Sequence, residues 1–418
     1  MRGVLLTALL AITGTTAGAQ RAATAGPPPA PGATLVISLL TFGPGDAVWE
    51  RFGHNAIRVR DTATGADLSY NWGMFSFDQA NFIGRFLSGD TRYWVDAFPT
   101  QTLLEYYVRN DRESIEQVLA LTPAQRLEIA TFVVENVKEE NKYYRYDYFR
   151  DNCSTRVRDV LDRVLGGSLQ RRFSVATTSF TYRDETIRLL TPDPLPQAGV
   201  DFALGPRADR PLSAWEAMFV PMRVRDYLRE VTIGADTGTI PLVSEERVLH
   251  QSQRAVEPVA RRRLALIGWA WILAVWIGLL TPTSPKARRW TRSAHAVIGA
   301  GWLLFTGLLG TILLLMWIGS AHVFWYNNLN LLVVSPLGLV AAGPYALAIH
   351  RGQLTLRMRW LLVVVLAQPA LALLLASVAS QHLGGPLQMI LPVQAMLALA
   401  LTLHLRVARE ARPGAGVA

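Results

Sequence analysis

The chain has 418 residues, half of them hydrophobic, with a formal net charge of +9 and one cysteine. This length exceeds what a single compact domain usually needs, and one cysteine excludes an internal disulfide framework. Most of the net charge is explained by the Lys and Arg residues in the loops between apolar segments near the C-terminus, so it reflects membrane topology and nucleic acid is not expected as a partner.

The N-terminus has the pattern of an export signal. A basic start precedes an apolar run, and residues 17–19 read Ala-Gly-Ala. We therefore expect residues 1–19 to be a signal peptide that is removed on export. Residues 20–33 are rich in Pro, Ala and Gly and cannot bury a core, so we interpret them as a linker.

Residues 34–260 are mixed in composition and are expected to form a globular domain with strands and helices. Within it, "HNAIRVR" and "DLSYNW" predict two strands joined by a turn that contains Thr and Gly. His54 opens the first of these strands and is the only histidine of the domain before His250. No phosphate-binding loop and no zinc-ligand cluster is present in this half, so no cofactor or metal is expected.

Three other segments of this domain carry simpler signals. Thr122, Pro123 and Gln125 predict a capped helix start. Residues 191–211 are crowded with proline and are interpreted as a loop. Residues 211–228 are interpreted as an amphipathic element near the bilayer.

Cys153 has no partner for a disulfide and is expected to be a free thiol in an exported domain. Apolar residues recur after it at helical spacing, and Gly166 and Gly167 end that pattern, so a helix is predicted. Asp151 or Asn152 is a natural N-cap, which places Cys153 in the first turn. There the helix dipole favours a thiolate, and free amides receive the negative charge of an attacked carbonyl.

A thiol nucleophile needs a base, usually a histidine, and His54 is the candidate. A histidine on a strand that faces a cysteine at a helix start is the geometry of papain-like enzymes. The alternatives are that Cys153 is a buried, inert residue and that His54 is a structural residue of its strand.

The C-terminal part is predicted to be a membrane domain over residues 261–406. Five apolar segments each approach the ~20 residues that cross a bilayer, and the lack of water in lipid requires them to be helices. We expect the spans to be Leu264–Leu280, Ala296–Ile318, Leu329–Ile349, Leu361–Ala379 and Leu387–Leu405.

The loops predict the orientation of these spans. Residues 281–293, residues 350–359 and the tail carry Lys and Arg, whereas residues 320–328 and 380–386 carry none. By the positive-inside rule the tail, residues 407–418, is cytoplasmic and the N-terminal domain lies outside.

Two groups near the outer face are candidates for binding lipid or substrate. Arg261 and Arg262 are basic on the outer side, which indicates either interfacial snorkelling or contact with anionic headgroups. His322, Asn328 and Asn330 are polar residues at the entry to the third span, where aromatic neighbours are ordinary interface residues. We expect these three to bind a lipid headgroup or the backbone of a lipoprotein.

Three stretches, "FGHNAIRVRD", "YNWGMFSFDQANFIGRFLSGDTRYW" and "YFRDNCSTRVRD", resemble motifs of the Lnb family. The resemblance covers residues 34–167 well and extends more thinly to "SAHVFWYNNLNLLVVSPLGL". It implies an α+β, permuted papain-like (NlpC-like) thiol domain, with histidine before cysteine as in lecithin retinol acyltransferase-like proteins, followed by an all-α transmembrane bundle. Family members are bacterial membrane proteins implicated in N-acylating lipoproteins, so we expect the inner membrane with the thiol domain on the periplasmic side.

Carried over residue by residue, the resemblance implies Cys153 as nucleophile and His54 as general base. Asn71 is the first choice for the residue that orients the imidazole and Tyr70 the second, because the hairpin register decides which of them faces His54. Asp151 and Asn152 are expected to support the site.

The resulting hypothesis is a thiol acyltransferase. Cys153 would take an acyl chain from a phospholipid and pass it, as a thioester, to the N-terminal amine of a diacylglyceryl lipoprotein. Two other functions stay open: a thiol amidase or peptidase acting on cell-wall peptides, and an envelope scaffold without enzymatic activity.

Overall fold

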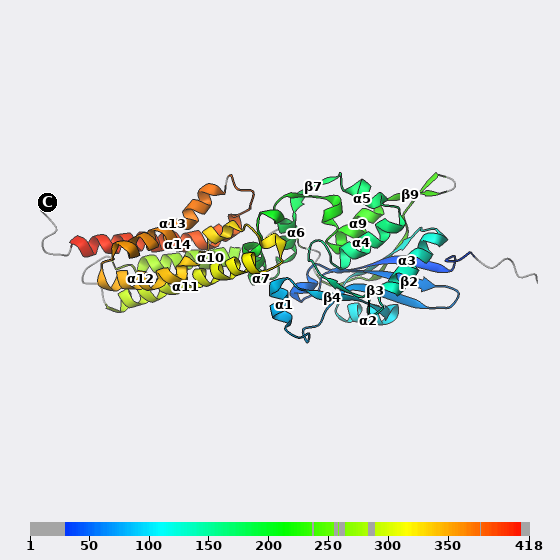
Figure 1. The fold of residues 1–418 in the computed structure, drawn as a ribbon, viewed down its shortest axis with the longest axis horizontal. Coiled ribbons are helices and arrows are strands. Elements are labelled where there is room, and N and C mark those ends of the chain that lie inside the picture. Colours follow the sequence, from blue (N-terminus) through cyan, green and yellow to red (C-terminus); the bar gives the residue numbers. More distant parts are fainter. Residues whose placement is uncertain are drawn as a thin grey trace, which may run out of the picture.

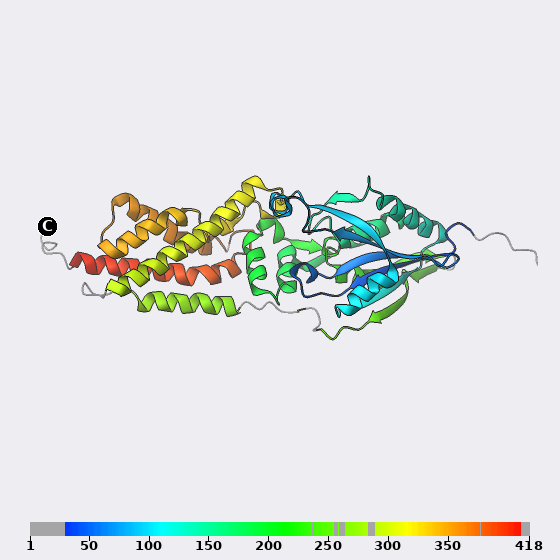
Figure 2. The same cartoon turned by 90° about the horizontal axis from the view of Figure 1, so that it is seen from below.

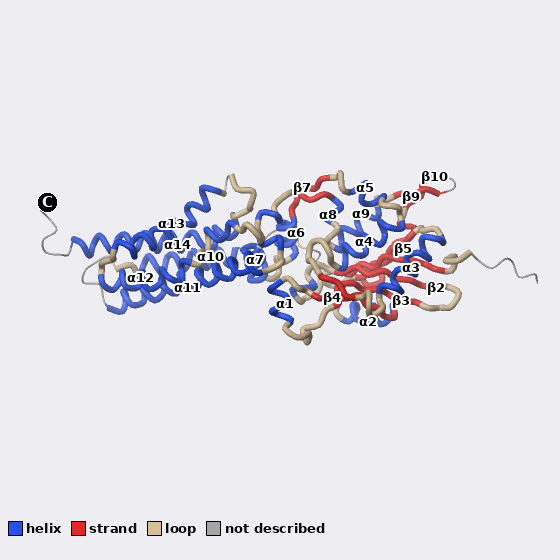
Figure 3. Tube along the Cα trace, viewed as in Figure 1, coloured by secondary structure: helices blue, strands red, loops and turns tan. Residues whose placement is uncertain are grey.

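The computed structural model describes residues 30–410 except 236–237, 255–257, 259–263, 283–288 and 377. The predicted signal peptide, Arg261 and Arg262 lie outside the described residues. An N-terminal part with a β-sheet and a C-terminal part of helices lie end to end along the long axis of the molecule (Figures 1 and 3). This arrangement is the α+β class with a helical second part that the sequence predicts.

The N-terminal part is built on a seven-stranded sheet in which every neighbouring pair is antiparallel. The order is β11-β5-β1-β2-β3-β4-β6. The predicted hairpin is confirmed as β2 and β3, with Ile57 opposite Tyr70. The strands are β1 (Leu35–Phe42), β2 (His54–Asp61), β3 (Asp67–Met74), β4 (Arg92–Pro99), β5 (Ser114–Leu119), β6 (Tyr143–Arg145) and β11 (Val243–His250).

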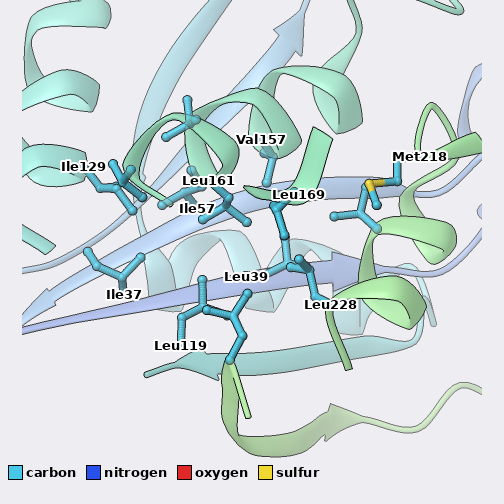
Figure 4. Packing of buried hydrophobic residues seen from close by; sticks show 14 of the residues in the cluster. Ile37, Leu39, Ile57, Leu119, Ile129, Val157, Leu161, Leu169, Met218 and Leu228 are labelled. Atoms are coloured by element: carbon cyan, nitrogen blue, oxygen red, sulfur yellow. The ribbon is translucent and has the colours of Figure 1, made fainter. Parts of the chain in front are cut away.

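Three helices pack on one face of this sheet, and one lies on the other. The first face carries α3 (Pro123–Asn136), α4 (Cys153–Val164) and α9 (Pro221–Arg229), and the second carries α2 (Thr100–Arg109). Side chains alternate along β1, so Leu39 enters the core under α4 whereas Leu40 packs toward α2. Figure 4 shows Leu39 and Ile57 beneath Val157 and Leu161 of α4. The two faces therefore present different side chains of the same strands.

Smaller elements complete the N-terminal part. A short helix, α1, lies at the boundary with the helical part in both ribbon views (Figures 1 and 2). The remaining elements are η1 (Val48–Glu50), α1 (Phe82–Ser88), α5 (Ser168–Phe173), β7 (Thr177–Thr181), α6 (Tyr182–Leu189), α7 (Pro194–Ala203), η2 (Pro206–Ala208), β8 (Pro211–Ser213), α8 (Ala214–Ala217), β9 (Thr232–Ala235) and β10 (Gly238–Pro241).

The structure corrects two of the sequence interpretations. The proline-rich stretch expected to be a loop contains the helix α7. Proline is compatible with this helix because Pro194 occupies the first turn, where its missing N–H has no intrahelical role. The segment expected to lie near the bilayer is buried within protein. Val224 and Leu228 of α9 are fully buried in the core of the sheet domain, whereas Phe219 and Met222 pack with Phe324 at the junction with the helical part. The helix start at Thr122 is confirmed, with its capping box formed by Gln125.

Five helices form the C-terminal part: α10 (Leu264–Leu279), α11 (Arg289–Gly319), α12 (Leu337–Arg351), α13 (Leu356–Leu375) and α14 (Gly384–Glu410). Among the described residues, four segments are long and apolar enough to cross a membrane, namely α11, α13, α14 and the stretch Leu329–Arg351 that contains α12. The described part of α10 has 16 residues. It spans about 24 Å, less than the ~30 Å of a bilayer core.

Candidate active site

Cys153 is the first residue of α4, and the cap in front of it determines that position. Asn152 Oδ1 accepts hydrogen bonds from the amides of Ser154 and Thr155, both at 2.9 Å. Thr155 Oγ1 in turn accepts from the Asn152 amide at 2.8 Å. Asn152 is therefore the N-cap, and its side chain leaves the amide of Cys153 available at the helix start.

A buried polar network ties this helix start to strand β2. Ser154 Oγ lies 2.9 Å from both Asn55 Oδ1 and the carbonyl oxygen of Met218. Asn55 Nδ2 donates to Thr41 Oγ1 at 2.9 Å. Asn55 and Ser154 are fully buried, so the loss of either partner would leave an unpaired polar group in the core. The network therefore holds Cys153 beside the strand that carries His54.

His54 and Asn71 are brought together on the α2 face of the sheet. His54 Nε2 lies 3.2 Å from Asn71 Oδ1, and Asn71 Nδ2 donates to the Ser69 carbonyl at 3.0 Å. The second bond fixes the orientation of the amide, so the oxygen faces the ring and Nε2 carries the proton. The lone pair of Nδ1 is then the one available to accept a proton. Tyr70, the other sequence candidate, points to the opposite face and is buried in the core.

Two rings and one cation pack around the imidazole. Tyr107 stacks on His54 with centroids 6.3 Å apart and ring planes at 16°, and Phe42 lies at 6.2 Å and 18°. Arg112 is buried and lies over the Tyr107 ring, where its guanidinium bonds the Gly43 carbonyl at 2.8 Å. These neighbours hold the ring plane and place a positive charge near it.

The environment keeps both site groups neutral at rest. Burial, and then the charge of Arg112, lower the pKa of His54 to about 4, while the bond to Asn71 acts in the opposite direction. Burial raises the pKa of the Cys153 thiol to about 11, although the backbone amides of Asn55, Ser154 and Cys153 lower it. A thiolate is the form expected from the helix start alone, but in the folded domain burial outweighs the amides.

Cys153 and His54 share neighbours rather than a direct hydrogen bond in this structure. The Asn55 amide, which follows His54 along β2, acts on the sulfur, and Arg112 acts on both side chains. Tyr107 stacks on the imidazole of His54, and an ionised Cys153 contributes to the raised pKa of Tyr107. The two groups therefore belong to one cluster, and hydrogen bonds in sites of this kind often shorten only when substrate binds.

Gly73 makes room for the thiol at the end of β3. Its φ is +92°, a conformation that favours glycine, and it lies at a register irregularity between β3 and β4. A β-carbon there would lie 3.4 Å from Cys153 Cβ. A larger side chain would occupy the space beside the sulfur.

Tyr144 on β6 is a residue of this site that sequence reasoning missed. Its hydroxyl is buried and makes no hydrogen bond of ordinary geometry in the described part of the chain, although the backbone amide of Gly73 acts on it and lowers its pKa. Burial raises the pKa of Tyr144 well above its ordinary value, and negative charge on Cys153 adds to the increase. Tyr144, Tyr107 and Arg112 were all missed because each reaches the site from a distant segment of the chain, and no local spacing in the sequence marks it.

Asp151 and Asn152 have different surroundings from those of the imidazole. The Asp151 carboxylate pairs with Arg156, with Oδ2 2.7 Å from Nη2. Asn152 Nδ2 donates to the Tyr148 and Phe219 carbonyls at 3.0 and 2.9 Å. Both residues fix the loop before α4, and neither is hydrogen-bonded to His54.

The predicted substrate-binding residues lie where the two parts of the molecule meet. His322 Nε2 is 2.7 Å from the Phe86 carbonyl oxygen. Asn328 Nδ2 donates to the Phe202 and Ala203 carbonyls, and Asn330 Nδ2 also donates to the Phe202 carbonyl. These donors join η3 (Val323–Trp325) and η4 (Leu329–Leu332) to the sheet domain. In this structure their hydrogen bonds are made within the protein, and their role in substrate binding stays a prediction. Among the described residues, no group of three or more His, Cys, Asp or Glu is placed to hold a metal.

Fold and site together define a membrane protein whose α+β domain presents a cysteine, a histidine and an asparagine beside a bundle of apolar helices. Residues 30–192 match the model of the Lnb N-terminal periplasmic domain, and residues 266–411 match that of the Lnb transmembrane domain. The chain therefore belongs to the Lnb family, and its N-terminal domain is periplasmic. No match was found among curated proteins or among solved structures. The papain-like description of the fold and the cytoplasmic side of the C-terminus stay predictions.

Proposed function

We propose that this protein is a thiol acyltransferase that moves an acyl chain from a phospholipid, through Cys153, to the N-terminal amine of a lipoprotein. The observation that carries the proposal is the clustering of Cys153 at a helix start with the His54–Asn71 pair. Direct contact between this domain and membrane helices favours a lipid ester over a cell-wall peptide as the source of the carbonyl. The resemblance to the Lnb family supplies the lipoprotein acceptor.

The first half of the reaction starts from the neutral pair. Nδ1 of His54 takes the thiol proton while Sγ of Cys153 attacks the ester carbonyl carbon. The carbon–oxygen bond to the glycerol then breaks, and the imidazolium returns the proton to the departing oxygen. The products of this half-reaction are a lysophospholipid and an acyl thioester on Cys153.

The second half transfers the acyl chain to nitrogen. The acceptor amine attacks the thioester carbon, His54 accepts a proton from the amine, and the carbon–sulfur bond breaks. The sulfur then regains a proton, and an amide has formed. Water has to be kept from the thioester, because hydrolysis would turn the sequence into phospholipase activity.

The proposed mechanism assigns two donors to the negative oxygen that forms in each half-reaction. One is the amide of Cys153, which the Asn152 cap leaves available. The other is the Tyr144 hydroxyl, which is buried near the thiol, lies by the Gly73 amide and has no acceptor for its own proton in the described part of the chain. Donors aimed at a developing oxyanion contribute more than the same groups in water, because no reorganisation is needed.

The test combines two mass measurements. The full-length protein in nanodiscs with labelled phospholipid is expected to gain one acyl mass at Cys153, sensitive to hydroxylamine, and Cys153→Ala is expected to gain none. Lipoprotein N-termini from cells with the wild type are expected to carry an N-acyl group that is lost with Cys153→Ala. Release of cell-wall peptide fragments without an acyl adduct would indicate the amidase instead, and full function in Cys153→Ala and His54→Ala would indicate a scaffold.

A further inference from the structure

An exposed apolar surface lies on the sheet domain next to the membrane helices. Trp49 and Phe77 are each 58% exposed, and Ile83 is 73% exposed, which is unusual for large apolar side chains of a water-facing domain. We call this surface the aromatic ledge. It consists of Trp49, Phe75, Phe77, Phe82, Ile83, Phe86 and Leu87.

The rings of the ledge are in mutual contact. Trp49 lies 5.3 Å from Phe77, and Phe77 lies 5.0 Å from Phe82, both edge to face. Phe82 stacks on Phe86 at 6.4 Å along α1. The ledge is therefore one continuous apolar surface built from η1, the loop after β3 and α1.

On its inner side the ledge leads toward the thiol. Phe75 lies 5.2 Å from Tyr93, and Tyr93 stacks on Tyr146 at 4.2 Å with ring planes at 17°. Tyr146 precedes Asp147, whose backbone pairs with that of Asp151 at 3.0 and 3.1 Å, two residues before Cys153, and an ionised Cys153 adds to the raised pKa of Tyr146. Ring contacts therefore run from the exposed surface to the loop that leads into Cys153.

On its outer side the ledge is joined to a membrane helix. The amide of Ala321, two residues beyond the end of α11, donates to the Ser88 carbonyl at 2.8 Å. Gly89 follows α1 with φ +75°, and a β-carbon there would lie 3.2 Å from Ala321, so the two segments are in close contact. Figures 1 and 2 show α1 beside the end of the helical part. The ledge thus lies at the level where α11 leaves the apolar layer.

Polar groups that suit a headgroup lie beside the rings. A small pocket under α1 is lined by Gln79, Phe82, Arg85, Asp90 and Arg92, among others, and Arg85 is paired with Asp90 at 3.2 Å. The Gln79 Nε2 atom is buried and has no hydrogen-bond partner in the part of the chain that the structure describes. The pocket, of about 10 Å³, is too small to enclose a phosphate, but the Gln79 amide and the Arg92 guanidinium at its edge are donors that suit a phosphate attached to acyl chains on the adjoining apolar surface.

We propose that the aromatic ledge is the docking surface for an acyl chain of a membrane phospholipid, and that Phe75, Tyr93 and Tyr146 line its path to Cys153. The occupant is a lipid because the ledge continues from a membrane helix and combines apolar area with cationic and amide donors. The direction of the path toward the thiol rests on the proposed function, whereas lipid contact at the ledge does not.

The first experiment reads lipid contact without any chemistry at the thiol. Full-length protein carrying Cys153→Ala is placed in nanodiscs that contain a phospholipid with a diazirine in its acyl chain, irradiated and mapped by peptide mass spectrometry. Peptides covering residues 75–87 are expected to be labelled at least fivefold more than peptides of α3. Phe77→Asp with Ile83→Asp is expected to remove this label and leave the label on α11 and α13 unchanged.

Matched variants separate docking from folding. Val134→Asp places the same charge on α3, where the side chain is 49% exposed and distant from the helical part (Figure 1), and is expected to leave the ledge label unchanged. Phe77→Ala with Ile83→Ala is a milder version that is expected to lower the label several-fold. Equal labelling of the ledge and α3, or a ledge label unchanged in the double Asp variant, would overturn the proposal. So would the finding that a second copy of the protein covers the ledge in place of the lipid.

The second experiment reads the path. In protein that retains Cys153, Phe77→Asp with Ile83→Asp is expected to slow the acylation of Cys153 by bilayer phospholipid at least tenfold. The rate of acylation by a short, water-soluble thioester is expected to stay within twofold of the wild-type rate. Equal loss with both donors would overturn the path. Labelling of the ledge without any acyl adduct in the wild type would retain the docking surface and refute the proposed function.

Discussion

Two regions of the molecule contain a histidine near an asparagine, and they use these residues differently. At the thiol site, Asn71 binds one nitrogen of His54 and leaves Nδ1 available. At the junction, both donors of Asn328 go to main-chain carbonyls, and its Oδ1 accepts from Gln381 Nε2 at 2.8 Å. His322 is likewise bound to a carbonyl.

This difference separates side chains that can take part in a reaction from side chains that hold two segments together. Groups that hold two segments together have their hydrogen-bonding capacity satisfied within the protein, because unpaired buried groups are destabilising. A reacting group needs capacity that is not satisfied until substrate arrives. Nδ1 of His54 and the proton of the Tyr144 hydroxyl meet that criterion, and the donors of Asn328 do not, although Oδ1 of Asn330 at the junction is also buried without a partner among the described residues.

The largest loss of acyl transfer is expected when the Cys153 thiol is removed. Cys153→Ala is expected to lower acyl transfer by at least about 10³-fold, since no other nucleophile replaces the sulfur. Thermal unfolding of the full-length protein in detergent is expected to stay within a few degrees of the wild type. Residual transfer above a tenth of the wild-type rate would show that Cys153 is not the nucleophile.

Removing the residue that orients the imidazole should have the next largest effect. Asn71→Ala is expected to lower the rate of acylation by about 10²-fold, because the ring loses the partner that fixes its tautomer. Ser69→Ala, on the same strand and face, is the matched control and should change the rate less than threefold. Similar losses in both variants would point to general damage of β3.

The lowered pKa of His54 predicts a dependence of stability on pH. The pKa is about 4 in the folded state against 6.5 ordinarily, so the unfolded chain binds more protons between these values. Stability is therefore expected to fall as pH drops from 6.5 to 4, by roughly 3 kcal/mol from this residue. His54→Gln should flatten that part of the curve of melting temperature against pH, and an unchanged curve would contradict the assignment.

A smaller effect is expected when the Tyr144 hydroxyl is deleted. Tyr144→Phe should lower the rate of acylation by about tenfold through loss of one oxyanion donor. The concentration of phospholipid giving half the maximal rate should not change. Tyr143→Phe, on the adjacent position of β6, is the control and should behave as the wild type. A change confined to the half-maximal concentration would indicate a binding role for Tyr144.

The smallest effect on transfer should come from the junction. Asn328→Ala is expected to reduce stability by about 2 kcal/mol, because two carbonyls and the Gln381 amide lose their partner. The rate per folded molecule should remain within threefold. A large loss of rate in protein that melts like the wild type would show that the polar residues of this loop bind substrate after all.

The helix at Cys153, its cap and the β2–β3 hairpin could all be predicted, since capping, periodicity and turn signals are local. The proline-rich segment was predicted wrongly because proline in a first helical turn has the same composition as proline in a loop. The burial of α9 was missed because an amphipathic pattern does not say whether protein or lipid covers its apolar face.

By itself the sequence determined the two-part organisation, the apolar segments and the candidates Cys153 and His54, because these depend on composition and short-range spacing. Only the tertiary structure decided that Asn71 rather than Tyr70 faces the imidazole, since strand register sets the face of every side chain. It also decided that burial outweighs the helix start in setting the thiol pKa, and that Arg112, Tyr107 and Tyr144 join the site. Those outcomes depend on which distant segments pack together, and no local pattern encodes them.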